Sequence, residues 1–500
     1  MRKIILLFTL LPIICYGQQI NTTFGSNGSV ITDYANDYDF FGDLLTLPDG
    51  KLLLFGNSNV ATNSNLNGFA VIKYNEDGSY DNSFGIRGKV ILNFDSYQNS
   101  NPTSAILQND GKILVAGNTA NNYRGAIMRL LPNGEIDTDF GFNGKIVLES
   151  KEVSKILLTP DQKIIILGKT TNDFSIEKLN SDGFYDLTFG TNGITTLDDN
   201  NTFEKFTCGE ILNDGSLICF GNSSNPNFQA NNVVFAKFSA NGIFDSVFGL
   251  KRITTQGNSN TSYINNYAKD LKVLSDNSIL LLVDGSYMDI NGFGDSRIYK
   301  IDMNGNLNPT FANNGYFQFY NGFGDDYMQN IILLNNGDFF VTLKRNSSNI
   351  STYLFNSNGT FNTNFSGITV SPSSNNIAFS RIHNDKMYIA YNLSDYQINS
   401  YLIDSQFLSI NESEIIINRP VVYPNPFTEK LNINLKKIEL QNTNITIFNS
   451  NGSEIFSKFY KNSINNEILS IDDLSTYSAG IYFLKIQSDN DSKTFKIIKK

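Results

Sequence analysis

The sequence predicts an all-β protein, a seven-bladed β-propeller of four-stranded repeats followed by a small C-terminal β-sandwich. The first observation is that one stretch, RLLPNGEIDTDFGFNGKIVL at residues 129–148, recurs as NEDGSYDNSFGIRGKVIL from Asn75 and as NSDGFYDLTFGTNGITTL from Asn180. The second is that short aliphatic and β-branched runs, bounded by Gly, Asn and Asp, accompany each copy, as expected of strands. The third is a change of composition after Phe407, where the repeats stop.

The chain begins with the features of a secretory signal peptide. Two basic residues precede an apolar run, residues 4–14, that is too short to span a bilayer, and the small Gly17 predicts cleavage before Gln18. Cys15 leaves a lipid-anchored protein as the alternative, although Ile14 is not the small residue that such processing normally needs. Since no later segment is long and apolar enough to cross a bilayer, we expect an exported mature chain with no transmembrane segment.

The overall charge restricts the class of partner. The formal net charge is −10, so the chain lacks the excess of basic residues expected of a protein that binds nucleic acid or an anionic membrane surface. With 40% hydrophobic and 17% charged residues, the composition is ordinary for a soluble folded protein. We therefore expect no nucleic-acid partner.

A phenylalanine ends each copy of the repeat, and the spacing between these phenylalanines gives the length of each repeat. Neighbouring copies are 49 to 63 residues apart, which indicates fixed strands joined by loops of variable length. An eroded copy near the end keeps the Asp-x-x-Phe spacing from Asp404 to Phe407. The phenylalanines of the repeat are Phe24, Phe84, Phe140, Phe189, Phe248, Phe311 and Phe365.

Each unit contains four strand signals, and seven such sets lie between Gly28 and Asp404. In the second unit they are KVILNF, TSAILQ, KILVAG and AIMRLL, with Asp110-Gly111 between the middle two. A two-residue hairpin turn needs positive φ at both positions, which Asn, Asp and Gly tolerate, so we interpret these acids as turn residues rather than calcium ligands. Four-stranded antiparallel units repeated radially are typical of a β-propeller. We expect the fragment from Asn21 to Gly25 and the one from Asp404 to Phe407 to meet where the ring closes.

This pattern resembles the delta-60 repeat family, a group of secreted bacterial propeller-like repeats. The resemblance is carried by GKILVAG, an aliphatic strand and LPNGEIDTDFGFNGKIV, and it covers roughly Ile20 to Phe407. It implies the fold, but the family has no general activity that could be transferred to this chain.

In the six copies from Phe84 onwards, the residue three before the phenylalanine is aspartate in four and asparagine in two. The exchange keeps a short hydrogen-bonding side chain and discards the charge, which favours capping of a local turn over metal binding or acid–base work. We expect the phenylalanine itself to fill the space between blades. The positions are Asp81, Asp137, Asp186, Asp245, Asn308 and Asn362.

Two cysteines, Cys208 and Cys219, follow the predicted signal peptide. A two-residue turn at Asp214-Gly215 would place Cys208 opposite Gly221, with Cys219 diagonal to it. Diagonal neighbours lie about 7–8 Å apart, too far for a comfortable disulfide, so we expect two buried thiols.

Alternation of strand direction sends the Asp-Gly hairpins and the phenylalanine connectors to one face, and the variable loops to the other. Function on repeat scaffolds usually lies on the variable face. In the fifth and sixth units SYMDINGFGD and YNGFGDDY place aromatic rings beside carboxylates, which predicts a glycan or cation site; the alternative is solvated loops whose rings pack locally. The candidate ligand residues are Tyr287, Asp289, Phe293, Asp295, Tyr320, Phe323, Asp325, Asp326 and Tyr327.

The sequence lacks the residues and motifs that several kinds of catalysis require. The only histidine is His383, so a histidine-based triad or a zinc site is not expected, and there is no G-x-S-x-G elbow, phosphate loop or dinucleotide fingerprint. The absence of tryptophan argues against sialidase-like propellers. We expect no catalytic residue, metal or cofactor, although paired-carboxylate hydrolysis of a polysaccharide stays open because the separation of the acids is invisible in a sequence.

After a proline-containing linker the chain continues as LNINL, ITIFNSNG, SEIFSKF, GIYFLKI and KTFKIIKK, alternating strands sufficient for a small β-sandwich. The run YPNPF, the later LSTYSAGIYFL and the terminal lysines resemble the type A sorting domain of the bacterial type IX secretion system. The resemblance implies export through both membranes and the type IX machinery as a partner. The alternative is that this sandwich is a carbohydrate-binding domain unrelated to secretion. The residues that carry it include Tyr423, Pro424, Asn425, Pro426, Gly480, Tyr482, Lys499 and Lys500.

We therefore expect a signal peptide at residues 1–17, a propeller at 18–408, a linker at 409–422 and a sorting domain at 423–500. The leading hypothesis for function is binding or adhesion at the cell surface, or after secretion, with an extracellular glycan or protein as ligand. The alternatives are an extracellular polysaccharide-active enzyme and a purely structural surface protein.

Overall fold

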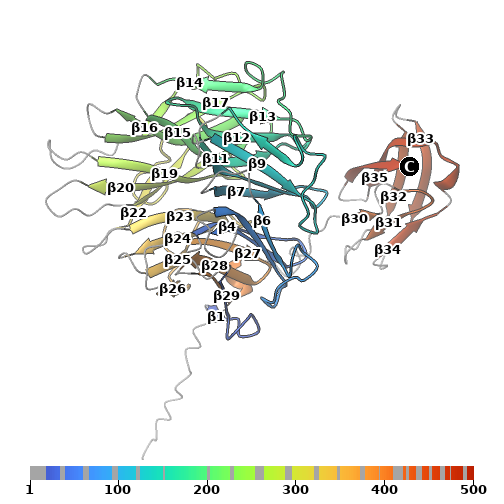
Figure 1. The fold of residues 1–500 in the computed structure, drawn as a ribbon, viewed down its shortest axis with the longest axis horizontal. Helices are drawn as coiled ribbons and strands as arrows, with labels where there is room; N and C mark the ends of the chain where they lie inside the picture. The colour runs from blue at the N-terminus through green and yellow to red at the C-terminus, as the bar shows by residue number, and fades with distance from the viewer. Residues whose placement is uncertain are drawn as a thin grey trace, which may run out of the picture. The chain divides into compact units, whose positions relative to one another are not determined.

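A computed structural model of the chain divides into two compact units, residues 1–409 and 410–500 (Figure 1). Among the described residues, no helix has the length and hydropathy needed to cross a membrane. The structure describes residues 18–33, 40–59, 67–92, 100–119, 124–149, 152–199, 203–225, 230–253, 264–287, 296–319, 326–345, 349–371, 378–392, 395–408, 421–423, 427–434, 442–449, 453–461, 468–472, 474–487 and 492–499. The predicted signal peptide lies outside these residues.

Seven antiparallel sheets make up the described part of the first unit, and in six of them the neighbouring strands are consecutive in the chain. The first contains β3 (Phe40–Thr46), β4 (Leu52–Asn59), β5 (Asn67–Tyr74) and β6 (Lys89–Leu92). The second contains β7 (Asn101–Leu107), β8 (Ile113–Thr119), β9 (Arg124–Leu130) and β10 (Lys145–Val147). The third contains β11 (Glu152–Leu158), β12 (Ile164–Lys169), β13 (Phe174–Leu179) and β14 (Ile194–Leu197).

The remaining sheets repeat this order. The fourth contains β15 (Phe203–Ile211), β16 (Leu217–Asn225), β17 (Ala230–Phe238) and β18 (Lys251–Ile253). The fifth contains β19 (Ile264–Val273), β20 (Ile279–Tyr287), β21 (Arg297–Ile301) and β22 (Tyr316–Gln318). The sixth contains β23 (Asp326–Leu333), β24 (Phe339–Arg345), β25 (Asn349–Phe355) and β26 (Ile368–Val370). The seventh contains β27 (Ala378–His383), β28 (Lys386–Asn392), β29 (Tyr396–Ile403), β1 (Gln18–Ile20) and β2 (Ser29–Thr32).

The first strands of successive sheets lie against one another, and β27 of the seventh sheet returns to β3 of the first (Figure 1). These seven strands therefore surround a common axis, and the short strands such as β6 lie outermost. The architecture is the predicted seven-sheet propeller. The boundaries of the units differ from the prediction: the run KVIL belongs to the sheet before it and not to the one after it. A sequence repeat fixes the period of the strands but not where one sheet ends.

The N-terminal strands close the ring, but the two chain fragments that were expected to meet there pack in different places: Phe24 between the seventh and first sheets, and Phe407 against Phe365 of the sixth sheet. β1 pairs with β29 from Gln18 opposite Ile403, and β2 pairs with β29 from Ser29 opposite Asn399. Phe24 lies between the seventh and first sheets against Tyr388, with ring centroids 5.6 Å apart. After β29 the short helix α1 (Ser405–Leu408) places Phe407 against Phe365 of the sixth sheet.

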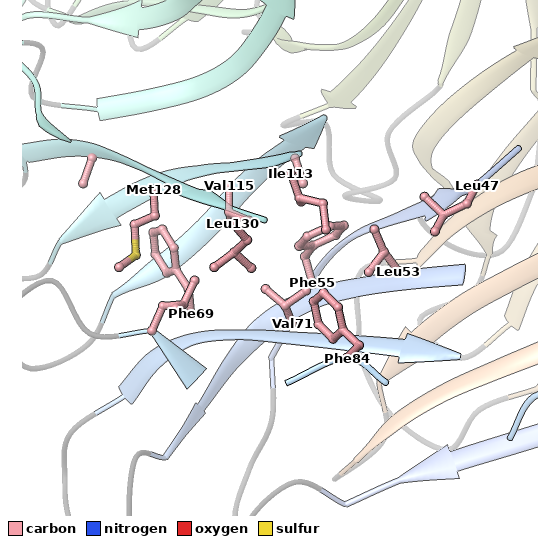
Figure 2. Packing of buried hydrophobic residues seen from close by; sticks show 13 residues of the cluster. Leu47, Leu53, Phe55, Phe69, Val71, Phe84, Ile113, Val115, Met128 and Leu130 are labelled. Atoms are coloured by element: carbon pink, nitrogen blue, oxygen red, sulfur yellow. The ribbon is translucent and has the colours of Figure 1, made fainter. Parts of the chain in front are cut away.

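Both predicted roles of the connector are confirmed in the second and third sheets. Phe140 and Phe189 are fully or almost fully buried, and Asp186 accepts hydrogen bonds from the backbone N–H and hydroxyl of Thr188. Figure 2 shows the same packing one sheet earlier, where Phe84 lies in the cluster formed by the facing sides of the first and second sheets.

The hairpin turns differ from the predicted two-residue form. At the first, Gly50 N–H donates to Leu47 O, and Leu47 N–H donates to Lys51 O, so the loop has three residues. Gly50 has positive φ, but Asp49 does not, because a type I turn followed by one left-handed residue needs only the last position to be left-handed. The seventh sheet is the exception: His383 pairs directly with Lys386, leaving a two-residue loop.

The cysteine prediction was right about the thiols and wrong about the register. Both thiols are free and buried. A β-bulge at Thr207 shifts the pairing, so Cys208 lies opposite Phe220 and Cys219 opposite Gly209. The two side chains consequently enter different clusters, one between the fourth and fifth sheets and one between the third and fourth. Burial raises the pKa of both thiols.

The connector aspartates also form partly buried ion pairs, which were not predicted from the sequence. Lys51 Nζ lies 2.9 Å from Asp81 Oδ2, Lys112 Nζ lies 2.9 Å from Asp137 Oδ2, and Lys163 Nζ lies 2.8 Å from Asp186 Oδ2. Where the aspartate becomes Asn308 or Asn362, the lysine position holds Ser278 or Asp338. In the fourth unit the aspartate remains as Asp245 although the lysine position holds Ser216. The lysine is therefore absent from every unit in which the aspartate is replaced, a signal that was present in the sequence.

This ion pair predicts a pH-dependent effect of Asp186→Asn. Burial opposes the charged form, but hydrogen bonds from Lys163 and Thr188 and the charge of Lys163 lower the pKa of Asp186 from 3.8 to about 2. A carboxyl with a lowered folded-state pKa stabilises fully above its unfolded pKa, and that stabilisation is lost as the pH falls from about 4 towards 2. We expect Asp186→Asn, which keeps the turn, to cost about 2 kcal/mol at pH 7 and little at pH 2.

Denaturant unfolding at both pH values checks this. The matched control is Asp182→Asn, since Asp182 is exposed and caps a turn without an ion pair among the described contacts. An equal cost of Asp186→Asn at pH 7 and pH 2 would contradict the ion-pair explanation.

The second unit contains two described sheets. One is β30 (Val421–Tyr423), β31 (Leu431–Asn434) and β34 (Ile468–Ile471); the other is β33 (Glu454–Tyr460), β32 (Thr443–Asn449), β35 (Gly480–Gln487) and β36 (Ser492–Lys499). A 3-10 turn, η1 (Leu474–Thr476), precedes β35. Both sheets contribute to one apolar core that includes Leu431, Ile433, Ile445 and Leu484. This arrangement is a small β-sandwich.

Candidate functional site

Most of the predicted ligand residues on the variable loops lie outside the described part of the chain. Tyr287 ends β20 and Asp326 begins β23, at the end of the propeller opposite the hairpins, and neither side chain is described. Tyr327 is exposed, with Lys344 Nζ 5.5 Å from its ring centroid. The constellation on this face therefore stays a prediction. The residues outside the description are Asp289, Phe293, Asp295, Tyr320, Phe323 and Asp325.

The described strands around the axis share a feature that the sequence did not reveal. Six of them carry a β-bulge at the middle, with one extra residue in each: Gly42, Thr103, Ser154, Thr207, Lys269 and Gln329. A bulge bends its strand and re-aims side chains, and bulges are frequent next to binding sites. The simple alternation of side chains along a strand therefore does not hold at the axis.

A side chain of the preceding sheet holds the backbone beside several of these bulges. Asn118 Oδ1 accepts the N–H of Val153 at 2.7 Å, and Asn222 Oδ1 accepts the N–H of Ala268 at 3.1 Å. In the fifth sheet Asp284 has this role and accepts the N–H of Met328 at 2.6 Å. Each contact satisfies a donor that the bulge removes from its own ladder. The bulges are thus built into the joints between sheets.

The bulged strands enclose a cavity of about 580 Å³. That volume lies in the range of about 300–1,000 Å³ typical of small-molecule sites. Its lining is mixed: polar and charged side chains stand beside Phe379, Ile331 and Ile382. Residues from all seven axial strands contribute, including Asp43, Thr103, Ser154, Lys155, Thr207, Lys269, Asp270, Lys272, Gln329 and Arg381.

Most charges around the cavity are paired within the protein. Arg381 forms an ion pair with Asp43 across the joint between the seventh and first sheets. Lys272 Nζ lies 3.3 Å from Glu210 and 3.4 Å from Asp270, and Lys269 Nζ lies 3.0 Å from Asp284. The Arg381–Asp43 and Lys272–Glu210 pairs link neighbouring sheets, whereas the other two lie within the fifth sheet.

Burial affects the titration of two of these carboxyl groups. Desolvation raises the pKa of Glu210, although the charge of Lys272 and a hydrogen bond from Val273 N–H oppose the shift. Desolvation likewise raises the pKa of Asp284, against the charge of Lys269 and the hydrogen bond from Met328 N–H. Both groups lie behind the cavity lining and hold lining lysines in place.

A separate group of acids lies near the opposite end from the hairpins, between the third and fourth sheets. One ligand oxygen from each of Asp173, Asp198 and Glu204 lies within 4.8 Å of the others. Glu204 is buried and accepts the N–H of Asp199 at 2.9 Å. No metal site was expected from the sequence, and three neighbouring carboxylates alone do not establish one.

In the second unit the structure brings three of the predicted sorting residues together. Gly480 pairs with Lys499 across β35 and β36, and Tyr482 follows on the same strand. The Tyr482 hydroxyl donates to Ser478 O at 2.8 Å, and the ring packs 6.5 Å from Phe427 between centroids. Lys499 Nζ lies 5.9 Å from the same Phe427 ring. Tyr423 ends β30 without a described side chain, and Pro424, Asn425, Pro426 and Lys500 lie outside the described residues.

Two family models match the chain. A secretion system C-terminal sorting domain matches residues 421–500. A β-propeller domain of unknown function, DUF5122, matches residues 47–84, 108–140 and 274–311. No curated protein matches the chain.

Several solved structures resemble the chain at low identity. PorZ of Porphyromonas gingivalis, described as an essential bacterial surface component of the type IX secretion system, is 11% identical with a TM-score of 0.39; the match covers 94% of this chain and 60% of PorZ. An α-L-arabinofuranosidase of Fusarium graminearum is 10% identical with a TM-score of 0.42, over 78% of this chain and 100% of the enzyme. The WD40 domain of Toxoplasma gondii coronin is 9% identical with a TM-score of 0.41, over 79% and 90% of the two chains. At these TM-scores we infer nothing from them about function.

The sequence repeats, the sheets and the two family matches lead to one description. The chain is a β-propeller of DUF5122-type repeats with a C-terminal sorting domain of the type IX secretion system, which directs it to the cell surface or the medium.

Proposed function

We propose that the exported propeller is a binding module that holds a saccharide in its axial cavity. The observation that carries this proposal is the ring of bulges, which surrounds a cavity of about 580 Å³ with polar side chains from every sheet. Saccharide sites combine hydrogen-bonding groups with an aromatic or apolar surface for the ring carbons. Phe379, Ile331 and Ile382 supply the apolar surface in this cavity.

The ion pairs favour binding over cleavage. Hydrolysis of a glycosidic bond usually uses two carboxyl groups, one of which is held protonated as the acid. The carboxylates that line the cavity, Asp43 and Asp270, are each engaged by a cation of the protein, Arg381 and Lys272. This arrangement supports a site that positions polar groups rather than one that releases a proton.

A thermal-shift screen of the secreted protein against neutral and acidic oligosaccharides tests the proposal. A saccharide at a hundred times its Kd should add about 2.7 kcal/mol to the free energy of unfolding. The shift should disappear in Thr207→Tyr, which fills the cavity, and persist in Thr196→Tyr, because Thr196 is exposed on the outermost strand of the third sheet.

The other outcomes identify the alternatives. A shift that survives Thr207→Tyr but is lost in Tyr327→Ala would move the site to the variable-loop face. The absence of any shift would favour a structural surface protein or a protein partner.

A further inference from the structure

We infer that Ser154, Lys155 and Thr207 form a subsite for a carboxylate, so that the saccharide bound in the cavity is an acidic one. This inference rests on the proposed function, since it names the class of ligand for the same cavity. Ser154 and Lys155 lie on β11 and Thr207 lies on β15, the axial strands of two neighbouring sheets. All three residues line the cavity.

The three side chains have unused hydrogen-bonding capacity. Ser154 Oγ is buried and has no hydrogen-bond partner. Lys155 has no ion pair, and Thr207 Oγ1 has no hydrogen bond, among the contacts of the described residues. A buried polar atom without a partner destabilises the folded state, so such a group in a native structure needs an explanation. A ligand that accepts hydrogen bonds would supply the missing partner.

Lys155 differs from the other cations of the cavity. Arg381, Lys269 and Lys272 each contact a carboxylate of the protein, so their charge is already balanced. The ammonium of Lys155 is the one cation of the described lining without such a partner. The unbalanced charge is positive, and it sits in a chain whose formal net charge is −10.

The bulges explain why these groups come together. Ser154 and Thr207 are the extra residues of equivalent bulges, and Lys155 and Cys208 follow them. Lys155 and Cys208 both line the cavity, on the axial strands of two neighbouring sheets. An ammonium and two hydroxyl groups that line one cavity provide donors for both oxygens of one carboxylate.

The chemistry of the subsite selects a ligand class. Hydrogen bonds between charged partners are shorter and stronger than neutral ones, and a partly desolvated ammonium favours an anion more than a hydroxyl group. A uronic acid provides a carboxylate together with ring hydroxyls for the remaining polar lining. A neutral hexose would leave the charge of Lys155 without a counter-ion.

Calorimetric titration of the secreted protein with trigalacturonic acid and with its fully methyl-esterified form tests this directly, because the ester keeps the sugar rings and their hydroxyl groups and removes the charge. We expect the acid to bind about 10- to 100-fold more tightly than the ester. Lys155→Met should reduce affinity for the acid by a similar factor and leave the ester unchanged, and Ser154→Ala should weaken the acid less. Lys237→Met is the matched control, since Lys237 lies on β17 of the fourth sheet, outside the cavity lining.

The outcomes separate this inference from the function on which it rests. Equal affinity for acid and ester, with both abolished by Thr207→Tyr, would overturn the carboxylate subsite and keep the binding module. Tight binding of the acid that Lys155→Met leaves intact would also overturn it. If neither compound and no other saccharide of the screen binds, both the inference and the proposed function are wrong.

Discussion

Replacing Phe140 by alanine is expected to lower the free energy of unfolding by about 3–5 kcal/mol. The ring is fully buried between the second and third sheets, among Leu114, Ile127, Val153 and Ile166. Its face also contacts the guanidinium carbon of Arg129, 4.5 Å from the ring centroid. Alanine would leave a cavity between the two sheets. The neighbouring side chains cannot move in to fill it, because the hydrogen bonds between strands fix the backbone of both sheets.

The matched control is two residues away on the same connector. Phe142 is 76% exposed, and its described ring contact is with the half-exposed Phe184, 5.7 Å between centroids. Phe142→Ala should therefore change stability by no more than about 0.5 kcal/mol. Denaturant unfolding followed by near-ultraviolet circular dichroism measures both. Similar costs for the two alanines would show that the connector phenylalanine does not fill the joint.

The connector was predictable because local chemistry decides it. A short polar side chain three residues before a buried aromatic ring fixes a turn whatever lies beyond, so the roles of Asp186 and Phe189 could be predicted by comparing copies of the repeat. The hairpin positions were predicted for the same reason. Their exact form was not, because both loop types use the same Asp-Gly residues and differ in the pairing of the residues around them.

The cavity could not be predicted in the same way. The bulge at Ser154 depends on a contact from Asn118 in the preceding sheet, 35 residues earlier in the chain. An extra residue in one strand leaves no mark in the composition of that strand, and it moved the expected partner of Cys208 from Gly221 to Phe220. Predicting the positions of the bulges requires knowledge of which sheets are neighbours. That information belongs to the tertiary structure.

Replacing residues 18–32 by a Gly/Ser sequence of the same length is expected to open the ring. The change removes β1 and β2 from the seventh sheet and takes Phe24 from the joint with the first sheet. Loss of the buried ring alone costs about 3–5 kcal/mol. With the lost strand pairing, we expect the thermal midpoint to fall by about 10 °C or more.

Other contacts between the seventh and first sheets remain in this variant and limit the loss of structure. Arg381 still pairs with Asp43, Lys386 with Glu76, and Asn392 Oδ1 still accepts the N–H of Phe41 at 3.1 Å. The opened protein should therefore keep its β-sheet circular dichroism while β29, its outer neighbour gone, becomes sensitive to limited proteolysis. An unchanged midpoint and unchanged protease resistance would mean that the N-terminal strands do not close the ring.

The cavity and the proposed binding of a saccharide both depend on closure of the ring, and a disulfide trap measures that closure most directly. Ile31 lies opposite Gln397 in the pairing of β2 with β29, and residues directly opposite in an antiparallel pair have the Cα spacing that a disulfide needs. We predict that Ile31→Cys with Gln397→Cys forms an intramolecular disulfide in the secreted protein, found in the non-reduced peptide digest, whereas the diagonal pair Ile31→Cys with Asn399→Cys forms little. Cross-linked dimers, or equal yields from the two pairs, would contradict the closed seven-sheet ring.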